Sequence, residues 1–255
     1  LVDRLDDPNR WLRFTALRLI GDRKDASIAP ELRGRLTGVR ALEALWALNL
    51  VGGLDTSTML AALHHDDPYV RAWAVRLACD DGRPAAEVAQ TIAKMAASEP
   101  NVEVRAQLAA SARRLPAREA LAVVKPLLHH AEDVADVQIP LLLWWAVEAK
   151  TTTDPEAVLA LFADRAVWDA PIAVSTIEER LMRRLAAAGG RKDLDGCVRL
   201  LSSAPSPAHV ARLMTGLEAA FLGRSTAGLP PQLAEAMERH GGSSVVLGLR
   251  RSKPE

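Results

Sequence analysis

The chain has few of the residues and patterns that mark the common functional classes. Its 255 residues include only two cysteines, Cys79 and Cys197, and neither stands in the CxxC or His-containing spacing of a zinc site. Lys+Arg and Asp+Glu both number 32, so the basic excess typical of nucleic-acid binders is missing. We therefore expect no metal ion, no cofactor and no nucleic-acid partner.

Long hydrophobic runs and catalytic motifs are also missing. The longest uncharged stretch of note, VQIPLLLWWAV at 137–147, has 11 residues, whereas a membrane-spanning helix needs about 20. No GxSxG, HExxH or glycine-rich phosphate loop occurs. The side chains of the adjacent histidines at 64–65 and 129–130 would diverge on a helix, so neither pair can bind one metal ion. Both pairs are expected near helix C-termini, where a protonated imidazole interacts favourably with the helix dipole. This region is therefore predicted to contain no membrane span and no enzyme active site.

The residues that are abundant favour helices. Alanine and leucine dominate, and β-branched runs that would build strands are scarce. In the segment DDPYVRAWAVRLA at 66–78, hydrophobic residues recur at i, i+3, i+4 and i+7, which places them on one face of a helix. The same spacing recurs from Ile139 to Val147. The predicted fold class is therefore all-α.

Arginine follows Leu or Val repeatedly in the first part of the chain, at intervals of 27, 31 and 34 residues. These pairs are Leu12-Arg13, Val39-Arg40, Val70-Arg71 and Val104-Arg105. Acidic-Pro turns precede three of them, and Asp before Pro is suited to cap a helix N-terminus. A period of this length without strand signals is typical of stacked helical hairpins.

We predict an α-solenoid of HEAT-like hairpins that forms a right-handed superhelix. Residues 1–150 would form regular repeats, and residues 151–255 would continue the same solenoid with less regular units. LVDRL at one end and SSVVLGLRRSKPE at the other both resemble parts of helices, so the chain is expected to be truncated at both ends. The other predicted helices are 27–36, 55–64, 84–97, 117–129, 154–163, 172–188, 191–202, 206–222 and 230–239.

Two interpretations of the recurring arginines remain open. In the first, they form a structural ladder with acidic residues of adjacent turns, because a guanidinium satisfies carboxylates with a planar set of donors. The ladder would consist of Asp7, Arg13, Arg40, Asp67, Arg71, Glu103 and Arg105. In the second, Arg71 and Arg105 line a concave surface and bind an acidic partner.

Trp144 and Trp145 are the other candidate binding residues. Adjacent positions on a helix point about 100° apart, so both rings cannot lie deep in the same interface. One of them is therefore expected to reach a groove or a partner surface, where tryptophan often dominates binding. The remaining tryptophans hold no common register with the arginines and are interpreted as core residues.

Several stretches resemble one family. They are IPLLLWWAVEA (139–149), LFADRAVWDAP (161–171), ERLMRRLAAAGGRKDL (179–194) and GLEAAFLGR (216–224). They are similar to the HEAT-repeat region of large bacterial proteins described as membrane-bound dehydrogenases or haem-binding cytochrome-c-domain proteins. In that family a β-propeller precedes the repeats and a CxxCH domain commonly follows them. The resemblance implies an extracytoplasmic, periplasmic parent and a spacer role for this region. No CxxCH occurs here, so no haem is assigned to it.

The leading functional hypothesis is a non-catalytic scaffold or spacer that contacts the flanking domains of its own parent or another protein. The alternative is an enzyme with a HEAT-like fold, such as a DNA glycosylase or a bilin lyase. A glycosylase would need a basic groove with an aromatic residue and a carboxylate, and the closest candidates are Trp144, Trp145 and Glu148. The neutral charge balance argues against this alternative.

Overall fold

The computed structural model describes residues 1–223 and 229–240. Over these residues the chain forms fifteen α-helices with short 3₁₀ and π segments and no strand, which confirms the all-α prediction. Contacts divide the chain into two compact units, residues 1–119 and 120–255. The stretch 243–255, expected to end inside a helix, lies outside the described residues, as does 224–228. The predicted change in repeat regularity at residue 150 stays a prediction.

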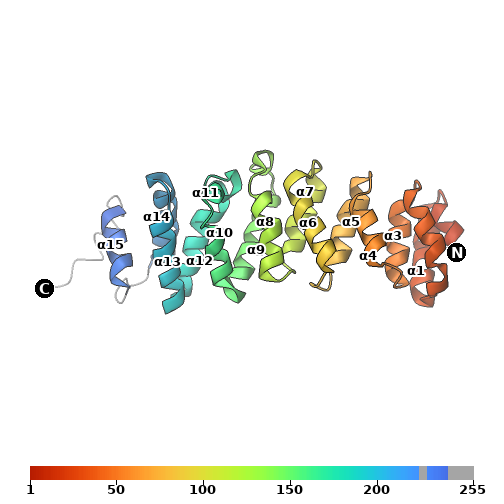
Figure 1. The fold of residues 1–255 in the computed structure, drawn as a ribbon, viewed down its shortest axis with the longest axis horizontal. Helices are drawn as coiled ribbons and strands as arrows, with labels where there is room; N and C mark the ends of the chain where they lie inside the picture. Colours follow the sequence, from red (N-terminus) through yellow and green to blue (C-terminus); the bar gives the residue numbers. More distant parts are fainter. Residues whose placement is uncertain (224–228, 241–255) are drawn as a thin grey trace. The chain divides into compact units, whose positions relative to one another are not determined.

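The helices of unit 1 follow one another in chain order (Figure 1). They are η1 (Val2–Asp6), α1 (Arg10–Arg23), η2 (Ala26–Ile28), α2 (Ala29–Gly34), η3 (Arg35–Thr37), α3 (Ala41–Leu50), α4 (Thr56–Leu63), α5 (Pro68–Cys79), α6 (Ala86–Ser98) and α7 (Val102–Ala112). Helices α1, α3, α5 and α7 pack successively against one another, while α2 contacts α3 and α4 contacts α5 and α6. Buried aliphatic side chains such as Leu17, Leu32 and Leu48 fill the space between the first helices.

The helices of unit 2 also follow the chain order (Figure 1). They are α8 (Ala117–Leu127, which starts just before the boundary), η4 (Ala131–Asp133), α9 (Ile139–Thr153), α10 (Pro155–Leu161), α11 (Arg165–Trp168), η5 (Ala173–Ile177, a π turn), α12 (Glu178–Ala188), α13 (Arg191–Ser203), α14 (Pro207–Phe221) and α15 (Pro231–His240). Most predicted helices agree with these to within a few residues. Helix α11 was missed because four residues are too few to show a helical period.

Helix α12 is the centre of packing in unit 2. It contacts α9, α13 and α14. At Gly216 of α14 the two backbones come so close that a Cβ would lie 2.1 Å from the carbonyl oxygen of Glu179. The buried side of α12 carries Glu178, Leu181, Met182, Leu185 and Ala186. The opposite side therefore remains available for contacts outside this core.

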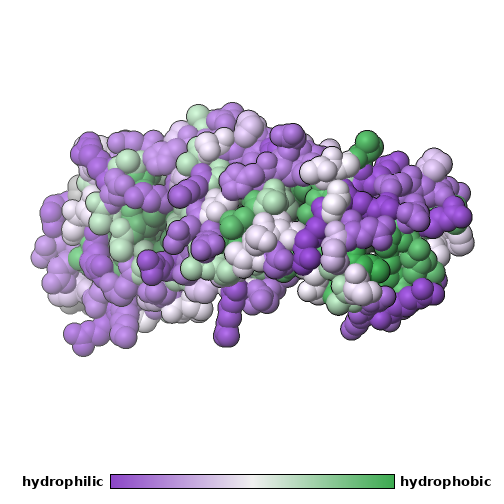
Figure 2. Space-filling model, turned by 45° about the vertical axis from the view of Figure 1, so that its right-hand side comes forward, coloured by the Kyte–Doolittle hydropathy of each residue, from purple (hydrophilic) through white to green (hydrophobic). Residues whose placement is uncertain are grey.

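The faces of the helices that do not pack are mainly polar. Figure 2 shows one face of the molecule, on which hydrophilic residues predominate. Among the described helices, none combines the length and hydrophobicity that crossing a bilayer requires. Because the hydrophobic positions of the amphipathic helices are used between helices, most of the polar positions face solvent.

Both cysteine thiols are buried and free. Burial raises the pKa of Cys79 and of Cys197 to about 12, because a thiolate loses its hydration in the hydrophobic interior. We expect neither thiol to react with a maleimide at neutral pH while the chain is folded, and both to react once guanidinium unfolds it. Mass spectrometry of labelled chains measures this difference, and rapid labelling of folded chains would contradict the burial.

Candidate functional site

A turn with the same hydrogen bonds precedes helices α1, α5 and α7 of unit 1. Its first element is the N-cap residue, whose side chain accepts from the backbone N–H two residues later. These N-caps are Asn9, Asp67 and Asn101. The predicted Asp-Pro cap is correct for Asp67 and Pro68. In α1 and α7 the cap is instead the asparagine that follows the proline.

The second element is an arginine at the fourth position of the helix, four residues after the N-cap. Arg71 donates from Nη1 to the carbonyl oxygens of His65 (2.8 Å) and Asp66 (2.9 Å). Arg13 makes the equivalent bonds to residues 7 and 8, at 2.9 and 3.1 Å. Arg105, which is buried, makes them to residues 99 and 100, at 3.0 and 2.9 Å. Each guanidinium therefore fixes the segment just before its helix against the first turn of that helix.

The third element, found at Arg71 and Arg13, is a carboxylate 28 or 30 residues further along the chain. Arg71 contacts Glu99 in a bidentate pair, with Nε 3.0 Å from Oε2 and Nη2 2.6 Å from Oε1. Arg13 Nε lies 2.9 Å from Oε1 of Glu43. Both pairs are shielded from solvent, and the side chain of Glu99 is only 4% exposed. Shielding holds both pairs in a more fixed geometry than exposed pairs have, and the two bonds between Arg71 and Glu99 fix that pair further.

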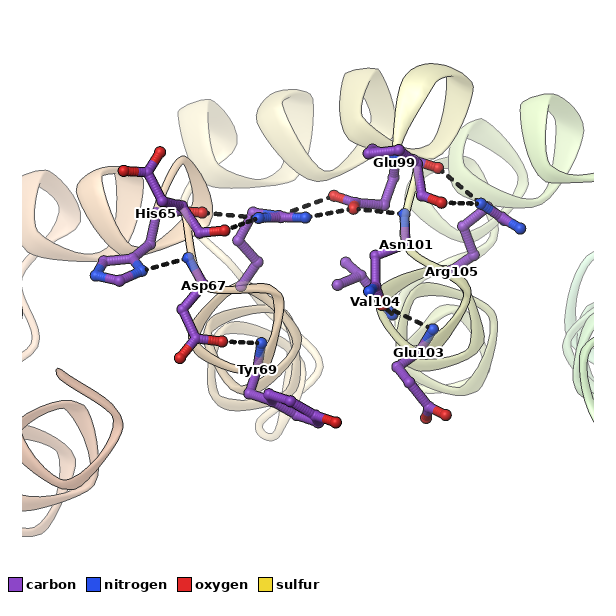
Figure 3. Close-up of polar contacts among 11 residues, drawn as sticks. His65, Asp67, Tyr69, Glu99, Asn101, Glu103, Val104 and Arg105 are labelled. Atoms are coloured by element: carbon purple, nitrogen blue, oxygen red, sulfur yellow. Dashed lines mark hydrogen bonds and ion pairs between the residues drawn. The ribbon is translucent and has the colours of Figure 1, made fainter. Parts of the chain in front are cut away.

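Glu99 links two of these turns into one network (Figure 3). Its carboxylate binds Arg71 and accepts from the N–H of Asn101 (3.0 Å), while its carbonyl oxygen accepts from Arg105. His65 extends the network to the preceding loop, because its Nδ1 accepts from Asp67 N–H and its Nε2 therefore carries the hydrogen that faces Leu36 O at 2.8 Å. The network thus joins the loops that precede α3, α5 and α7.

The ladder uses partly different residues from those predicted. Asp67 caps its own helix, and Asp7 supplies its carbonyl to Arg13 while its carboxylate pairs with Arg4. Glu103 lies exposed in the first turn of α7. Arg40 differs from the other three arginines, because it is itself the N-cap of α3 and lies 3.9 Å from Glu43.

Arg71 and Arg105 were also candidates for binding an acidic partner. Four donor atoms on their side chains are used in bonds within unit 1. Little of either guanidinium is exposed, so the geometry favours the ladder for both. A sequence signal for this arrangement exists but was missed, namely the Asn or Asp four residues before Arg13, Arg71 and Arg105.

In unit 2 a cleft of about 430 Å³ lies between α9 and α12, beside the π turn η5. Trp144 and Glu148 of α9 line one side. Ser175 and Thr176 of η5 and five residues of α12, of which all but Arg184 are exposed, complete it. The α12 residues are Glu179, Arg180, Arg183, Arg184 and Ala187. π turns within helices occur often at functional sites.

Charges in the cleft are unevenly paired. Arg184 Nε lies 3.6 Å from Oε1 of Glu148, and its Nη2 donates to Thr152 at 3.2 Å. Arg180 and Arg183 are exposed and form no ion pair within the described part of the chain. Arg180 lies three residues before Arg183 and four before Arg184, and like charges at these spacings repel each other on a helix. The cleft therefore has a positive side on α12, on which the described residues pair only Arg184 with a carboxylate.

The two tryptophans differ in burial, as helix geometry predicts, and a partner contact by either of them stays a prediction. Trp144 is 8% exposed and borders the cleft, whereas Trp145 is 44% exposed. The other tryptophans are less uniform than the core interpretation assumed, because Trp11 is largely exposed and Trp46 packs edge-on against Trp73 with only partial burial. Trp168 is buried and donates to the carbonyl of Phe162.

We expect replacement of Trp144 and of Trp145 by alanine to have unequal effects. Trp144→Ala removes a buried ring and should lower the free energy of unfolding by about 3–5 kcal/mol. Trp145→Ala should lower it by no more than about 1 kcal/mol, because nearly half of that side chain is exposed. Urea denaturation of both variants measures the difference, and equal small losses would contradict the packing of α9.

A buried polar cluster lies behind the cleft on α12. Glu178 is fully buried, and its Oε1 is 2.9 Å from Nδ1 of His209 on α14. Arg212 lies 3.7 Å from the other carboxylate oxygen, and Asp169 lies 3.5 Å from His209. Burial raises the pKa of Glu178, an effect that His209 and Arg212 oppose. The ring of Trp168 packs edge-on against the ring of His209 and covers the cluster. We interpret the cluster as a structural link between α12 and α14.

No group of three or more potential metal ligands occurs in the parts of the chain that the structure describes. Comparison with known proteins adds no identity: no family model, no curated protein and no solved structure matches the chain.

Proposed function

We propose that this chain is a helical-repeat region of a larger protein and acts as a non-catalytic scaffold. Its helices would form HEAT-like hairpins in a right-handed solenoid, and its role would be to hold flanking domains or a partner protein in fixed positions. The main support is the arginine turn, which occurs at Arg13, Arg71 and Arg105 with the same bonds each time. Stacked repeats are built from the same structural unit repeated along the chain, so the same turn is expected to recur.

The arrangement of neighbouring helices is consistent with this proposal. Within unit 1, α1, α3, α5 and α7 form a row of contacts, and α4 and α6 contact each other beside it. In a solenoid each repeat contacts only its neighbours, so two such rows are expected. The cleft between α9 and α12 would then be one binding surface of the array.

The resemblance of residues 139–224 supports a more specific proposal. The parent would be an extracytoplasmic dehydrogenase-like or cytochrome-c-domain protein, and this region would space its domains. The gene region around residues 1–255 provides the test. A β-propeller upstream or a CxxCH domain downstream is expected, and those domains, expressed separately, should co-purify with the chain. A neighbourhood with neither domain would overturn the parent assignment.

The solenoid itself has an independent test in small-angle scattering. A compact domain of this length would have a radius of gyration of about 18 Å. A solenoid is extended, so the measured value should be clearly larger. A value near that of a compact domain would overturn the solenoid and with it the scaffold.

A further inference from the structure

We propose that the face formed by α9 and α12 binds an acidic segment of a partner protein that also carries a large aliphatic side chain. This inference rests on the scaffold function and names the chemistry of its partner. The cleft of about 430 Å³ has the size of a site that takes a few side chains. Its lining combines tryptophan with arginine, two of the residue types that are enriched among the residues contributing most to protein interfaces.

The positive side of the site consists of Arg180, Arg183 and Arg184. Of these three, only Arg184 forms an ion pair with a carboxylate among the described residues, and that contact with Glu148 is long at 3.6 Å. Arg180 and Arg183 lie one helical turn or less from it and are exposed in the cleft. A carboxylate binding between them would relieve their repulsion and form charge-assisted, bidentate hydrogen bonds. The free protein therefore carries positive charge that an acidic ligand would neutralise.

The apolar side of the site lies on α9. Leu141 and Trp145 are 36% and 44% exposed, which is unusual among large hydrophobic residues of this helix. They precede Glu148 at spacings of seven and three residues, so all three share one helix face. Leu141 and Trp145 therefore continue the cleft as an apolar strip, and an aliphatic side chain of the partner is expected to cover it.

A peptide fits the site better than a nucleic acid does. Glu148 and Glu179 line the same cleft as the arginines, and a row of phosphates would meet these carboxylates. A peptide places its carboxylates one at a time, and its backbone N–H groups have the two glutamates as acceptors. The equal totals of basic and acidic residues over the whole chain also suit a peptide partner.

The test is fluorescence anisotropy of a labelled, glutamate-rich peptide with central leucines, titrated with the full chain. A matched peptide with glutamine in place of glutamate and a single-stranded oligodeoxynucleotide serve as the other probes. Saturable binding of the glutamate peptide is expected, and the Arg180→Ala/Arg183→Ala double variant should weaken it at least about tenfold. Both side chains are exposed, so these replacements leave the core unchanged.

The control is the Arg191→Ala/Lys192→Ala double variant, which removes the same charge from exposed positions of α13 outside the cleft. It should bind the glutamate peptide as the unmodified chain does, while Trp145→Ala should weaken binding severalfold. The proposal is overturned if no saturable binding occurs, or if the glutamine peptide binds equally well. It is also overturned if the control variant loses as much affinity, or if the oligodeoxynucleotide binds as tightly through the same arginines. None of these results would change the scattering test, so the docking site can fail while the scaffold stands.

Discussion

Replacement of Arg71 by alanine is expected to lower the free energy of unfolding by about 3–5 kcal/mol, because it leaves a shielded carboxylate without its cation. Glu99 is 4% exposed at its side chain and would keep only the N–H of Asn101. The carbonyls of His65 and Asp66 would also lose their donor. Urea denaturation followed by circular dichroism measures the loss.

The control for Arg71 is an exposed ion pair in the same unit. Arg18 and Asp22 lie 3.6 Å apart on α1 with both side chains mostly exposed, so Arg18→Ala should cost no more than about 0.5 kcal/mol. Arg71→Lys should recover only part of the stability, because an ammonium cannot reproduce the planar set of bonds. If Arg71→Ala cost no more than Arg18→Ala, the turn would not be a stabilising element.

The second large effect is expected at Gly216. An added Cβ would lie 2.1 Å from the carbonyl oxygen of Glu179 and 3.1 Å from the amide nitrogen of Arg183. Both are backbone atoms of α12 and cannot move without shifting the helix. Gly216→Ala should therefore lower the free energy of unfolding by about 3 kcal/mol or more, measured by denaturation of the purified variant.

Gly196 provides a matched control on a neighbouring helix. Its added Cβ would lie 3.5 Å from side-chain atoms of Leu159 and Leu185, which is ordinary van der Waals contact. Alanine has the higher helix propensity, so Gly196→Ala should raise the free energy of unfolding by about 0.5–1 kcal/mol. Opposite signs for the two variants are expected, and two similar values would contradict the close approach of α12 and α14.

Hydrophobic spacing and composition were sufficient to predict every described α-helix except the four-residue α11, and their order. The recurrence of arginine was also visible, because the residues lie at regular intervals. Their carboxylate partners were not predictable in this way. Arg71 reaches Glu99 and Arg13 reaches Glu43 only because consecutive helices pack side by side, and packing register is a tertiary property that local spacing does not determine.

The candidate site could likewise be predicted only in part from the sequence. The different exposure of Trp144 and Trp145 followed from helix geometry alone. The arginines of α12 did not enter the prediction, because residues 180–184 resemble any solvated helix face in the sequence. Only the packing of α12 against α9 brings them opposite Trp144. The close contact at Gly216 could not be predicted either, because it also depends on how two helices pack.

The most direct test of the arginine turn as a link between successive helices of unit 1 is a double-mutant cycle on Arg71 and Glu99. Free energies of unfolding are measured for the unmodified chain, Arg71→Ala, Glu99→Ala and the double variant. Because Arg71 of α5 and Glu99, the C-cap residue of α6, form a shielded, bidentate pair, a coupling energy of at least about 1 kcal/mol is predicted. Additive losses, with a coupling below about 0.3 kcal/mol, would contradict it.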